Sequence, residues 1–363
     1  MGFIETEERK NMEIEEFKRT VLLACAGLSR RKDDEEFKGL HASSKEMDDD
    51  YGEEKLVCVT SGLSFLGLAI VNRLLVRGYS VRIIVDNPDD IEKLRELETS
   101  GQIMTGNNCV RAVMAKLCEE ESLCEAFQGC RGVFHTSAFT DPAGLSGYTK
   151  SMAEIEVKAC ENVIKACSRT CSVRNIVLTS SLLACVWHDS SNNLSPVINH
   201  QSWSDESVCI DKKLWYALGK LKTEKAAWTM AKDKGLKLVT ICGGLVTGPE
   251  FYRRNPTATL AYLKGAPDMY KNGLLATIDV MKLADAHASV FQAMNKTAFG
   301  RYICYDRVIE SEYQAEKLAM QIGVPVNKIS GNEPENVQAR FELSDKKLRT
   351  LMARTCRNCY YES

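Results

Sequence analysis

From Lys55 onward, short apolar segments of strand type alternate with segments that have the spacing of amphipathic helices. Residues 56–60 read LVCVT, a turn containing serine and glycine follows, and apolar side chains then recur at helical spacing over residues 66–75. Residues 81–85 read VRIIV, a second run rich in β-branched residues. A strand, a helix and a strand in this order form the unit from which parallel sheets are built.

The same alternation continues as far as residue 242. We expect further strands at residues 110–114, 132–135, 175–179 and 236–242, and helices at residues 119–127, 153–167 and 216–232. Strands that are nearly continuous apolar runs are typical of a parallel sheet covered by helices on both faces. The sequence therefore predicts an α/β fold with a doubly wound, Rossmann-type parallel sheet and a smaller C-terminal lobe.

Composition divides the chain into three parts. Residues 1–53 are rich in Glu, Lys and Asp, which predicts a polar, disordered extension. Residues 54–249 carry the strict alternation and form the predicted Rossmann domain. Over residues 250–363 the alternation lapses, and we expect mainly a substrate-binding lobe, interleaved with the sheet, near the carboxyl ends of the strands where ligands of such folds bind.

The charge and the cysteine content of the chain argue against several classes of protein, namely nucleic-acid-binding, membrane-bound and disulfide-bonded proteins. The formal net charge is −2, so electrostatics favours neither nucleic acid nor an anionic membrane as a partner. No apolar run reaches the roughly 20 residues that span a bilayer. The fifteen cysteines have scattered spacing, which favours free thiols in a reducing, cytoplasmic compartment. We expect no metal site, and interpret His135 and His287 as structural residues.

The turn after the first strand is a candidate phosphate-binding element. Residues 60–67 read TSGLSFLG and lead into a helix N-terminus, where backbone N–H groups can hold a pyrophosphate. Glycine normally occupies such turns, because the backbone must approach the phosphate closely. This turn is poor in glycine, so on its own it leaves two interpretations open: a nucleotide site or a simple connection between strand and helix.

Tyr216 and Lys220 are candidates for acid–base chemistry. Residues four apart on a helix project from the same face, one turn apart. A nearby ammonium favours phenolate over phenol, so we expect Lys220 to lower the pKa of Tyr216 and to make it a general acid near neutral pH. This spacing also arises by chance, and the pair alone does not establish a site.

Ser181 lies two residues beyond the predicted strand at residues 175–179, at its carboxyl end. A hydroxyl at the carboxyl end of a strand lies in the crevice where the ligand of such a fold binds. Ser181 could donate a hydrogen bond to a carbonyl oxygen that is becoming an alkoxide. The alternative is a serine that only shapes a turn, but its place ahead of the Tyr216 helix favours the functional interpretation.

Taken together, these segments and several later ones resemble a known family. The matching segments are residues 59–67, 133–136, 179–181, 215–220, 244–249, 279–287 and 300–304. In order and spacing they resemble the plant cinnamoyl-CoA reductase and dihydroflavonol reductase branch of the extended short-chain dehydrogenases, over about residues 55–330. The resemblance is strongest to the cinnamoyl-CoA reductase-like group.

The resemblance implies an oxidoreductase that uses NADP or NAD to reduce a small-molecule carbonyl or CoA-thioester. It implies that Tyr216 protonates the carbonyl oxygen, that Ser181 stabilises it, and that Lys220 holds the ribose and tunes Tyr216. A monomer or weak homo-oligomer is expected. The implied cofactor contacts are Thr60, Ser61, Gly62, Ser64, Phe65, Leu66, Gly67, Asp86, Lys93, Lys116, Leu117, Thr136, Tyr216, Lys220, Gly243 and Val246.

The chain departs from its family around the nucleotide. Ser61 and Ser64 replace glycines of the turn, and each adds a Cβ and a hydroxyl near the phosphates. Asp86 replaces an arginine that meets the 2′-phosphate of NADP, and an acidic residue there favours NAD. Lys116 replaces an aspartate. We hypothesise that Asp86 and Lys116 pair, or that Lys116 with Lys93 supplies the phosphate contact.

Departures near the catalytic tyrosine concern the substrate. Leu214, Ala217 and Leu218 replace Asn, Cys and Tyr of the cinnamoyl-CoA reductase signature, and Gly243 replaces a proline beside the nicotinamide. Two alternatives to a cinnamoyl-CoA reductase-like activity therefore stay open. One is a ketone reductase of the dihydroflavonol type; the other is a catalytically weak nucleotide sensor or scaffold.

Overall fold

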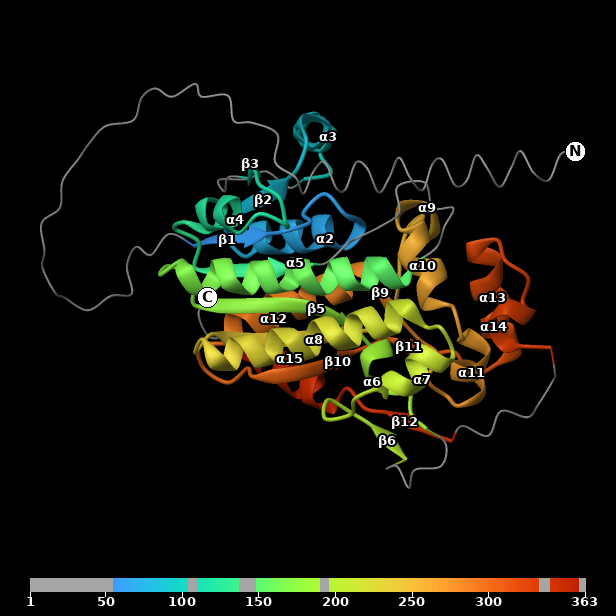
Figure 1. The fold of residues 1–363 in the computed structure, drawn as a ribbon. Helices are drawn as coiled ribbons and strands as arrows, with labels where there is room; N and C mark the ends of the chain where they lie inside the picture. Colours follow the sequence, from blue (N-terminus) through green and yellow to red (C-terminus); the bar gives the residue numbers. More distant parts are fainter. Residues whose placement is uncertain (1–54, 104–109, 137–147, 190–195, 333–339, 359–363) are drawn as a thin grey trace, which may run out of the picture. The chain divides into compact units, whose positions relative to one another are not determined.

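The computed structural model describes residues 55–103, 110–136, 148–189, 196–332 and 340–358 (Figure 1). The polar extension predicted for residues 1–53 lies outside the described residues. The division into a Rossmann domain and a substrate lobe stays a prediction.

A parallel sheet forms the centre of the described chain. Within the described residues it has seven strands in the order β10-β7-β5-β4-β1-β2-β3, and every neighbouring pair is parallel. This arrangement confirms the predicted doubly wound, Rossmann-type fold. The strands are β1 (Leu56–Val59), β2 (Ser80–Val85), β3 (Val110–Met114), β4 (Gly132–His135), β5 (Asn175–Ser181), β7 (Lys237–Gly243) and β10 (Gly300–Cys304).

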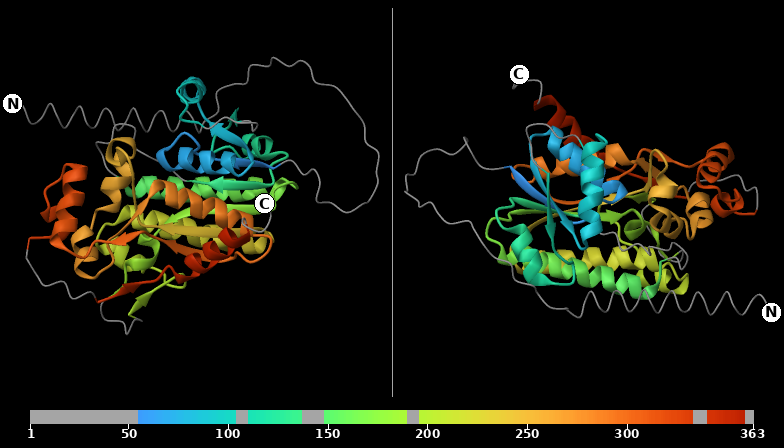
Figure 2. Two further views of the ribbon diagram at one scale, coloured as in Figure 1. Left: turned by 180° about the vertical axis from the view of Figure 1, so that it is seen from behind. Right: turned by 90° about the horizontal axis from the view of Figure 1, so that it is seen from above.

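Helices cover both faces of this sheet, as Figure 2 shows in its right-hand view. On one face α5 packs against α4 and α8, and on the other α12 packs against α2 and α15. Helix α3 follows β2. These helices are α2 (Phe65–Val76), α3 (Pro88–Thr99), α4 (Glu120–Phe127), α5 (Lys150–Arg169), α8 (Trp215–Asp233), α12 (Val280–Ala293) and α15 (Lys346–Asn358).

Strand β1 shows why the sheet is buried on both sides. Successive side chains of a strand point to opposite faces. Val57 and Val59 accordingly pack in the apolar cluster that contains α2 and α12, whereas Cys58 packs in the cluster that contains α4 and α5. All three side chains are fully buried. The apolar runs of the sequence therefore became central strands.

Shorter elements connect and extend the sheet. Strand β10 comes from the C-terminal third of the chain and pairs with β7 at the edge of the sheet. The small strands are β6 (Val197–Ile198), β8 (Leu245–Thr247), β9 (Ala276–Asp279), β11 (Arg307–Val308) and β12 (Glu342–Leu343). The short helices are α6 (Leu183–Val186), α7 (Glu206–Asp211), α9 (Phe251–Arg254), α10 (Pro256–Tyr262), α11 (Ala266–Lys271), α13 (Glu312–Ile322) and α14 (Asn327–Ser330).

The register of the sheet gathers polar residues at one edge. Ser181 at the end of β5 is opposite Gly243 at the end of β7, and Val59 of β1 is opposite Phe134 of β4. Because parallel strands end at the same edge, the residues that follow these strands lie in one crevice. Among the described residues, no helix is long and apolar enough to cross a membrane.

Candidate active site

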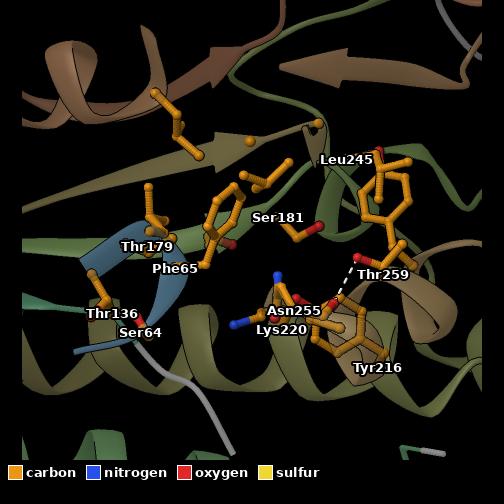
Figure 3. Close-up of a pocket in the computed structure, with 18 of the residues that line it drawn as sticks. Ser64, Phe65, Thr136, Thr179, Ser181, Tyr216, Lys220, Leu245, Asn255 and Thr259 are labelled. Atoms are coloured by element: carbon orange, nitrogen blue, oxygen red, sulfur yellow. Dashed lines mark hydrogen bonds between the residues drawn. The ribbon is translucent and has the colours of Figure 1, made fainter. Parts of the chain in front are cut away.

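A pocket opens at the carboxyl edge of the sheet. Its lining comes from the start of α2, the residue after β4, the ends of β5 and β7, strand β8, and residues of α5, α8, α10 and α12 (Figure 3). Its lining residues are Ser64, Phe65, Leu66, Thr136, Tyr148, Glu156, Thr179, Ser180, Ser181, Tyr216, Lys220, Gly243, Gly244, Leu245, Val246, Asn255, Ala258, Thr259, Tyr262 and Leu283.

Ser181 enters the pocket from the last position of β5. Its side chain is buried, and its hydroxyl oxygen accepts a hydrogen bond from the backbone N–H of Leu183 at 3.2 Å. This bond fixes the hydroxyl while its proton can still be donated to another group. In Figure 3, Ser181 lies across the pocket from Tyr216 and Lys220.

Tyr216 and Lys220 enter from the first turns of α8, which packs along α5. Their four-residue spacing places Nζ of Lys220 5.4 Å from the centre of the Tyr216 ring. Lys220 is only 4% exposed, although lysine is rarely buried without a partner. The structure therefore brings the three predicted catalytic side chains to one pocket.

The partner of Lys220 is Glu156, a residue that the sequence analysis missed. Nζ of Lys220 lies 2.7 Å from Oε1 of Glu156. The hydroxyl of Tyr148 donates a hydrogen bond to Oε2 of the same carboxylate. A sequence signal existed, because Glu156 interrupts the apolar stripe of α5 between Met152 and Cys160, which are both buried.

Burial changes the acidity of Tyr216 in the direction opposite to our prediction. Burial raises the pKa of Tyr216, the ammonium of Lys220 lowers it, and the carboxylate of Glu156 raises it again, so the result is a raised pKa. For Lys220, burial lowers the pKa, but Glu156 outweighs this effect and the pKa is raised. The predicted lowering of the Tyr216 pKa was wrong, since it considered Lys220 alone.

In the turn before α2, the side chain of Ser64 makes its hydrogen bonds within the turn and the first turn of the helix. The hydroxyl of Ser64 accepts a hydrogen bond from the N–H of Gly67 at 3.0 Å and donates one to the carbonyl of Ser61 at 2.8 Å. Ser64 is thus the N-cap of α2. A Cβ at Gly67 would lie 1.9 Å from the Ser61 oxygen, which explains why glycine persists there.

Two parts of the pocket fit a dinucleotide. Ser64, Phe65 and Leu66 line it at the N-terminus of α2, where N–H groups and the helix dipole favour an anion. At the end of β4, Thr136 also lines it, and its buried hydroxyl has no hydrogen-bond partner within the described part of the chain. A buried hydroxyl without a partner is costly, and a bound polar ligand would satisfy it.

Eight of the predicted cofactor contacts lie outside this pocket: Thr60, Ser61, Gly62, Gly67, Asp86, Lys93, Lys116 and Leu117. Asp86 and Lys93 are exposed. Oδ1 of Asp86 accepts a hydrogen bond from Nδ2 of Asn87 at 2.8 Å, while Lys116 pairs with Glu119 at 3.4 Å. Asp86 and Lys116 thus have different partners, so the hypothesis that they pair was wrong.

Gly243 and Val246, two further predicted cofactor contacts, do line the pocket. Gly243 ends β7 and its carbonyl accepts a hydrogen bond from the N–H of Leu182 at 2.7 Å. This bond ties the ends of β5 and β7 together beside Ser181.

Both interior histidines have structural partners. Nδ1 of His135 lies 3.0 Å from the Thr60 hydroxyl, and His287 contacts the hydroxyl of Thr179 at 2.8 Å and the carbonyl of Leu283 at 2.7 Å. Burial lowers the pKa of each histidine to about 4. Across the described ranges, no group of three His, Cys, Asp or Glu side chains is arranged to hold a metal ion.

The residues that differ from the cinnamoyl-CoA reductase signature do not reach the pocket. Leu214, Ala217 and Leu218 are buried in the apolar core. The pocket is instead lined by Asn255, which lies between α9 and α10, and by Ala258, Thr259 and Tyr262 of α10. The hydroxyl of Thr259 donates to the Asn255 carbonyl at 2.7 Å (Figure 3). These residues were not predicted from the sequence, because they come after the region in which strands and helices alternate regularly.

Comparison with known proteins gives several related reductases. The chain is 34% identical over 320 residues to cinnamoyl-CoA reductase 1 of Petunia hybrida, which covers 85% of this chain and 91% of the relative. It is 38% identical over 258 residues to cinnamoyl-CoA reductase 1 of Arabidopsis thaliana, covering 69% and 70%. Tetraketide alpha-pyrone reductase 1 of Arabidopsis thaliana is 31% identical over 261 residues, covering 70% and 78%.

Among solved structures, a yeast methylglyoxal/isovaleraldehyde reductase complexed with NADPH superimposes with a TM-score of 0.61 at 20% identity. The match covers 82% of this chain and 93% of that one, and it supports the fold. The family model of the 3-beta hydroxysteroid dehydrogenase/isomerase family matches residues 58–242. The predicted resemblance is therefore confirmed, and the chain belongs to this family of extended short-chain dehydrogenases, with cinnamoyl-CoA reductases among its relatives.

Proposed function

We propose that this chain is an NAD(P)H-dependent reductase of a carbonyl or CoA-thioester group, and that Ser181, Tyr216 and Lys220 act on the substrate and cofactor. One observation carries the proposal. These three side chains line a single pocket together with the N-terminus of α2 and the hydroxyl of Thr136, which has no hydrogen-bond partner among the described residues. Family membership supports the oxidoreductase class.

In this proposal the nicotinamide, when bound, supplies a hydride to the carbonyl carbon. With a thioester, the C–S bond then breaks, the proton on the oxygen passes to the CoA sulfur, and an aldehyde and free CoA are the products. Tyr216 donates its phenolic proton to the carbonyl oxygen, for which its raised pKa leaves it in the protonated form. Ser181 donates a hydrogen bond to the same oxygen and stabilises the charge that develops there. Lys220 lies beside the Tyr216 ring, where its ammonium can contact the ribose.

The proposed cofactor is NADPH or NADH. A yeast structural neighbour is complexed with NADPH, which supports a nicotinamide nucleotide in this fold. The exposed carboxylate of Asp86 at the end of β2 favours NADH, because it repels a 2′-phosphate and can accept bonds from ribose hydroxyls. Lys93 and Lys116 are the candidate contacts for a 2′-phosphate if NADPH binds.

The proposed substrate is cinnamoyl-CoA-like, after the relatives named cinnamoyl-CoA reductase. A ketone reductase is a second candidate, because a relative of similar identity is named tetraketide alpha-pyrone reductase. Apolar Leu245, Ala258 and Leu283 in the pocket suit an aromatic or aliphatic acyl group. We further propose a cytoplasmic location, which the free thiols among the described cysteines support. We also propose that the protein is a monomer or a weak homo-oligomer.

The test is turnover of a panel of hydroxycinnamoyl-CoA thioesters, aldehydes and ketones with each cofactor, in wild type and Tyr216→Phe. Loss of the proton donor is expected to lower kcat/KM by about 10²–10⁴-fold. Cofactor affinity, measured by quenching of protein fluorescence, is expected to stay within about threefold, because the phenol acts on the substrate oxygen.

The panel separates the candidate functions. Preference for thioesters supports the cinnamoyl-CoA reductase-like activity, and preference for ketones supports the second candidate. Cofactor binding without any turnover that depends on Tyr216 would refute both, and would favour the nucleotide sensor.

A further inference from the structure

The carboxylate of Glu156 lies against the ammonium of Lys220 inside the proposed active site. The two charged atoms are 2.7 Å apart, and the side chains of Lys220 and Glu156 are only 4% and 2% exposed. A buried ion needs a close opposite charge, because removal from water is otherwise very costly. Lys220 therefore meets a full negative charge on one side and the ring of Tyr216 on the other.

Tyr148 holds the second oxygen of this carboxylate. Its hydroxyl donates to Oε2 of Glu156, and its ring packs edge-on against the ring of Tyr216, with centroids 5.0 Å apart and an interplanar angle of 73°. Both oxygens of Glu156 are thus engaged, one by Lys220 and one by Tyr148. The carboxylate is fixed in a position from which its charge acts on Lys220 and Tyr216 together.

We propose that Glu156 is a positioning residue that fixes the Lys220 ammonium and offsets its charge, so that Tyr216 remains protonated for reduction. The inference rests on the proposed function, since it concerns the direction of that reaction. Reduction needs a phenol that donates a proton, whereas the reverse oxidation needs a phenolate that accepts one. A lysine alone favours phenolate; a lysine paired with Glu156 does so far less.

Among the described residues, the other titratable groups around Tyr216 and Lys220 do not supply this charge. On β4, burial and the Lys220 charge lower the pKa of His135 to about 4. On α5, burial and then Glu156 raise the pKa of Cys160, and on α10, burial and then Tyr216 raise the pKa of Tyr262. For Tyr148, burial and then Glu156 raise the pKa. All four groups are neutral near pH 7, which leaves the pair of Lys220 and Glu156.

The experiment is a titration of Tyr216 in Glu156→Gln, which keeps the shape of the side chain and removes its charge. The absorbance of phenolate is measured against pH, and each variant is compared with the same variant carrying Tyr216→Phe, so that the difference isolates Tyr216. Unit charges a few ångströms apart in a protein shift a pKa by roughly one to two units. In Glu156→Gln we therefore expect Tyr216 to ionise at a pH that is lower than in wild type by that amount.

Glu161→Gln is the matched control. Glu161 is on the same helix, α5, and pairs with Lys158 at 3.5 Å, but that pair is at the surface. The same chemical change there is expected to leave the Tyr216 titration unchanged. An equal shift in both variants would mean that loss of any carboxylate from α5 is sufficient, and would overturn the proposal.

Activity gives a second readout that is independent of the first. In Glu156→Gln, the pH at which reduction declines is expected to fall with the Tyr216 titration. The reverse oxidation, of the product alcohol or, for a thioester substrate, of the product aldehyde with free CoA, is expected to begin at lower pH. If no substrate is turned over but the titration shifts, the proposed function fails, and what stands is that Glu156 offsets the Lys220 charge and keeps Tyr216 protonated. If turnover occurs and neither readout moves, this inference fails and the proposed function stands.

Glu156→Gln leaves Lys220 without its buried counter-charge and can prevent folding. Glu156→Asp then decides the matter, because it keeps the charge and withdraws it from Lys220 by one methylene. A smaller shift of the Tyr216 titration toward lower pH supports the proposal. A titration that superimposes on wild type, in a variant with wild-type thermal stability, overturns it.

Discussion

The pocket, which is the catalytic end of the proposed site, and the predicted adenosine end, which lies beyond β2 and outside the pocket, are built in different ways. At the catalytic end Ser181, Thr136 and Lys220 are buried, and each is held by elements of the central sheet or its covering helices. At the adenosine end, beyond β2, Asp86 and Lys93 are exposed side chains that meet solvent. The catalytic end is therefore preorganised by its neighbours, whereas the adenosine end presents exposed charged side chains that a bound ligand would have to order.

This difference tells where a substitution acts. At the catalytic end, each polar side chain is also part of the packing, so a change affects stability and chemistry together. At the adenosine end, a change affects mainly the choice of nucleotide, because exposed charges contribute little to stability. The predictions below separate these two behaviours.

The largest effect on stability is expected for Glu224, beneath the catalytic end. Its fully buried carboxylate accepts a hydrogen bond from Ser180 at 2.7 Å and pairs with Nε of Arg301 at 2.8 Å. Glu224→Ala leaves the Arg301 charge buried without its partner, which typically costs about 3–5 kcal/mol. Urea unfolding followed by circular dichroism measures this loss in the free energy of unfolding.

The matched control is Glu206→Ala, which removes a carboxylate paired with Lys225 at 3.2 Å on the surface. That change is expected to cost less than about 1 kcal/mol. Similar losses for Glu206 and Glu224 would contradict the claim that the catalytic end depends on its buried network.

The second expected effect is loss of stability in acid. His135 and His287 have folded-state pKa values of about 4, below the value of about 6.5 in the unfolded chain. Between these values the unfolded chain binds more protons, so stability is complete above about pH 6.5 and is lost as pH falls toward 4. The slope is at most about 1.4 kcal/mol per pH unit for each histidine.

Urea unfolding at several pH values checks this, with His287→Gln as the informative variant. Gln keeps polar atoms near Thr179 and Leu283, the partners of His287, and does not titrate in this range. The variant is expected to lose stability less steeply below pH 6.5. An unchanged slope would show that carboxylates, and not this histidine, determine the acid sensitivity.

The sequence predicted the catalytic end of the site better than the adenosine end. The strands of the sheet are apolar runs, so their positions and parallel arrangement could be inferred from the sequence. Ser181, Tyr216 and Lys220 could be identified because family motifs preserve their order. Glu156 could not be assigned, because helical periodicity shows that its position is buried but not that Lys220 meets it there.

The pKa of Tyr216 was mispredicted for the same reason. Spacing along α8 brings Lys220 near the ring, but burial and the charge of Glu156 come from other elements and act in the opposite direction. At the adenosine end, the hypothesis of an Asp86–Lys116 pair failed because long exposed side chains find nearer partners, here Asn87 and Glu119. Local spacing does not determine such choices.

The adenosine end is tested by Asp86→Arg. Burial and then the neighbouring Asp86 raise the pKa of Asp90, which indicates that two carboxyl groups lie close together at this end. Replacing Asp86 with arginine removes one negative charge and adds a guanidinium that suits a phosphate. We expect the ratio of NADPH to NADH affinity to rise about tenfold, equivalent to about 1.4 kcal/mol.

Dissociation constants for both nucleotides, measured by fluorescence, check this, with Asp89→Arg as a control for charge on the neighbouring exposed position of α3. The control is expected to change the ratio less. A wild type that strongly prefers NADPH, together with an unchanged Asp86→Arg variant, would show that Asp86 does not determine the choice of nucleotide.

The smallest expected effect concerns Ser64, which lines the pocket just before α2. Its hydroxyl caps α2 through Gly67 and donates to Ser61, so its hydrogen bonds lie within the turn. Ser64→Ala is expected to cost about 1 kcal/mol of stability, and Ser64→Gly only a few tenths. Since the hydroxyl serves the turn, nucleotide affinity in Ser64→Gly is expected to stay within about threefold of wild type. Thermal unfolding and nucleotide titration measure the two quantities separately. Suppose instead that nucleotide affinity falls tenfold or more while stability barely changes. The Ser64 hydroxyl would then donate a hydrogen bond to the phosphate of the ligand, and the expectation that it serves only the turn would be wrong.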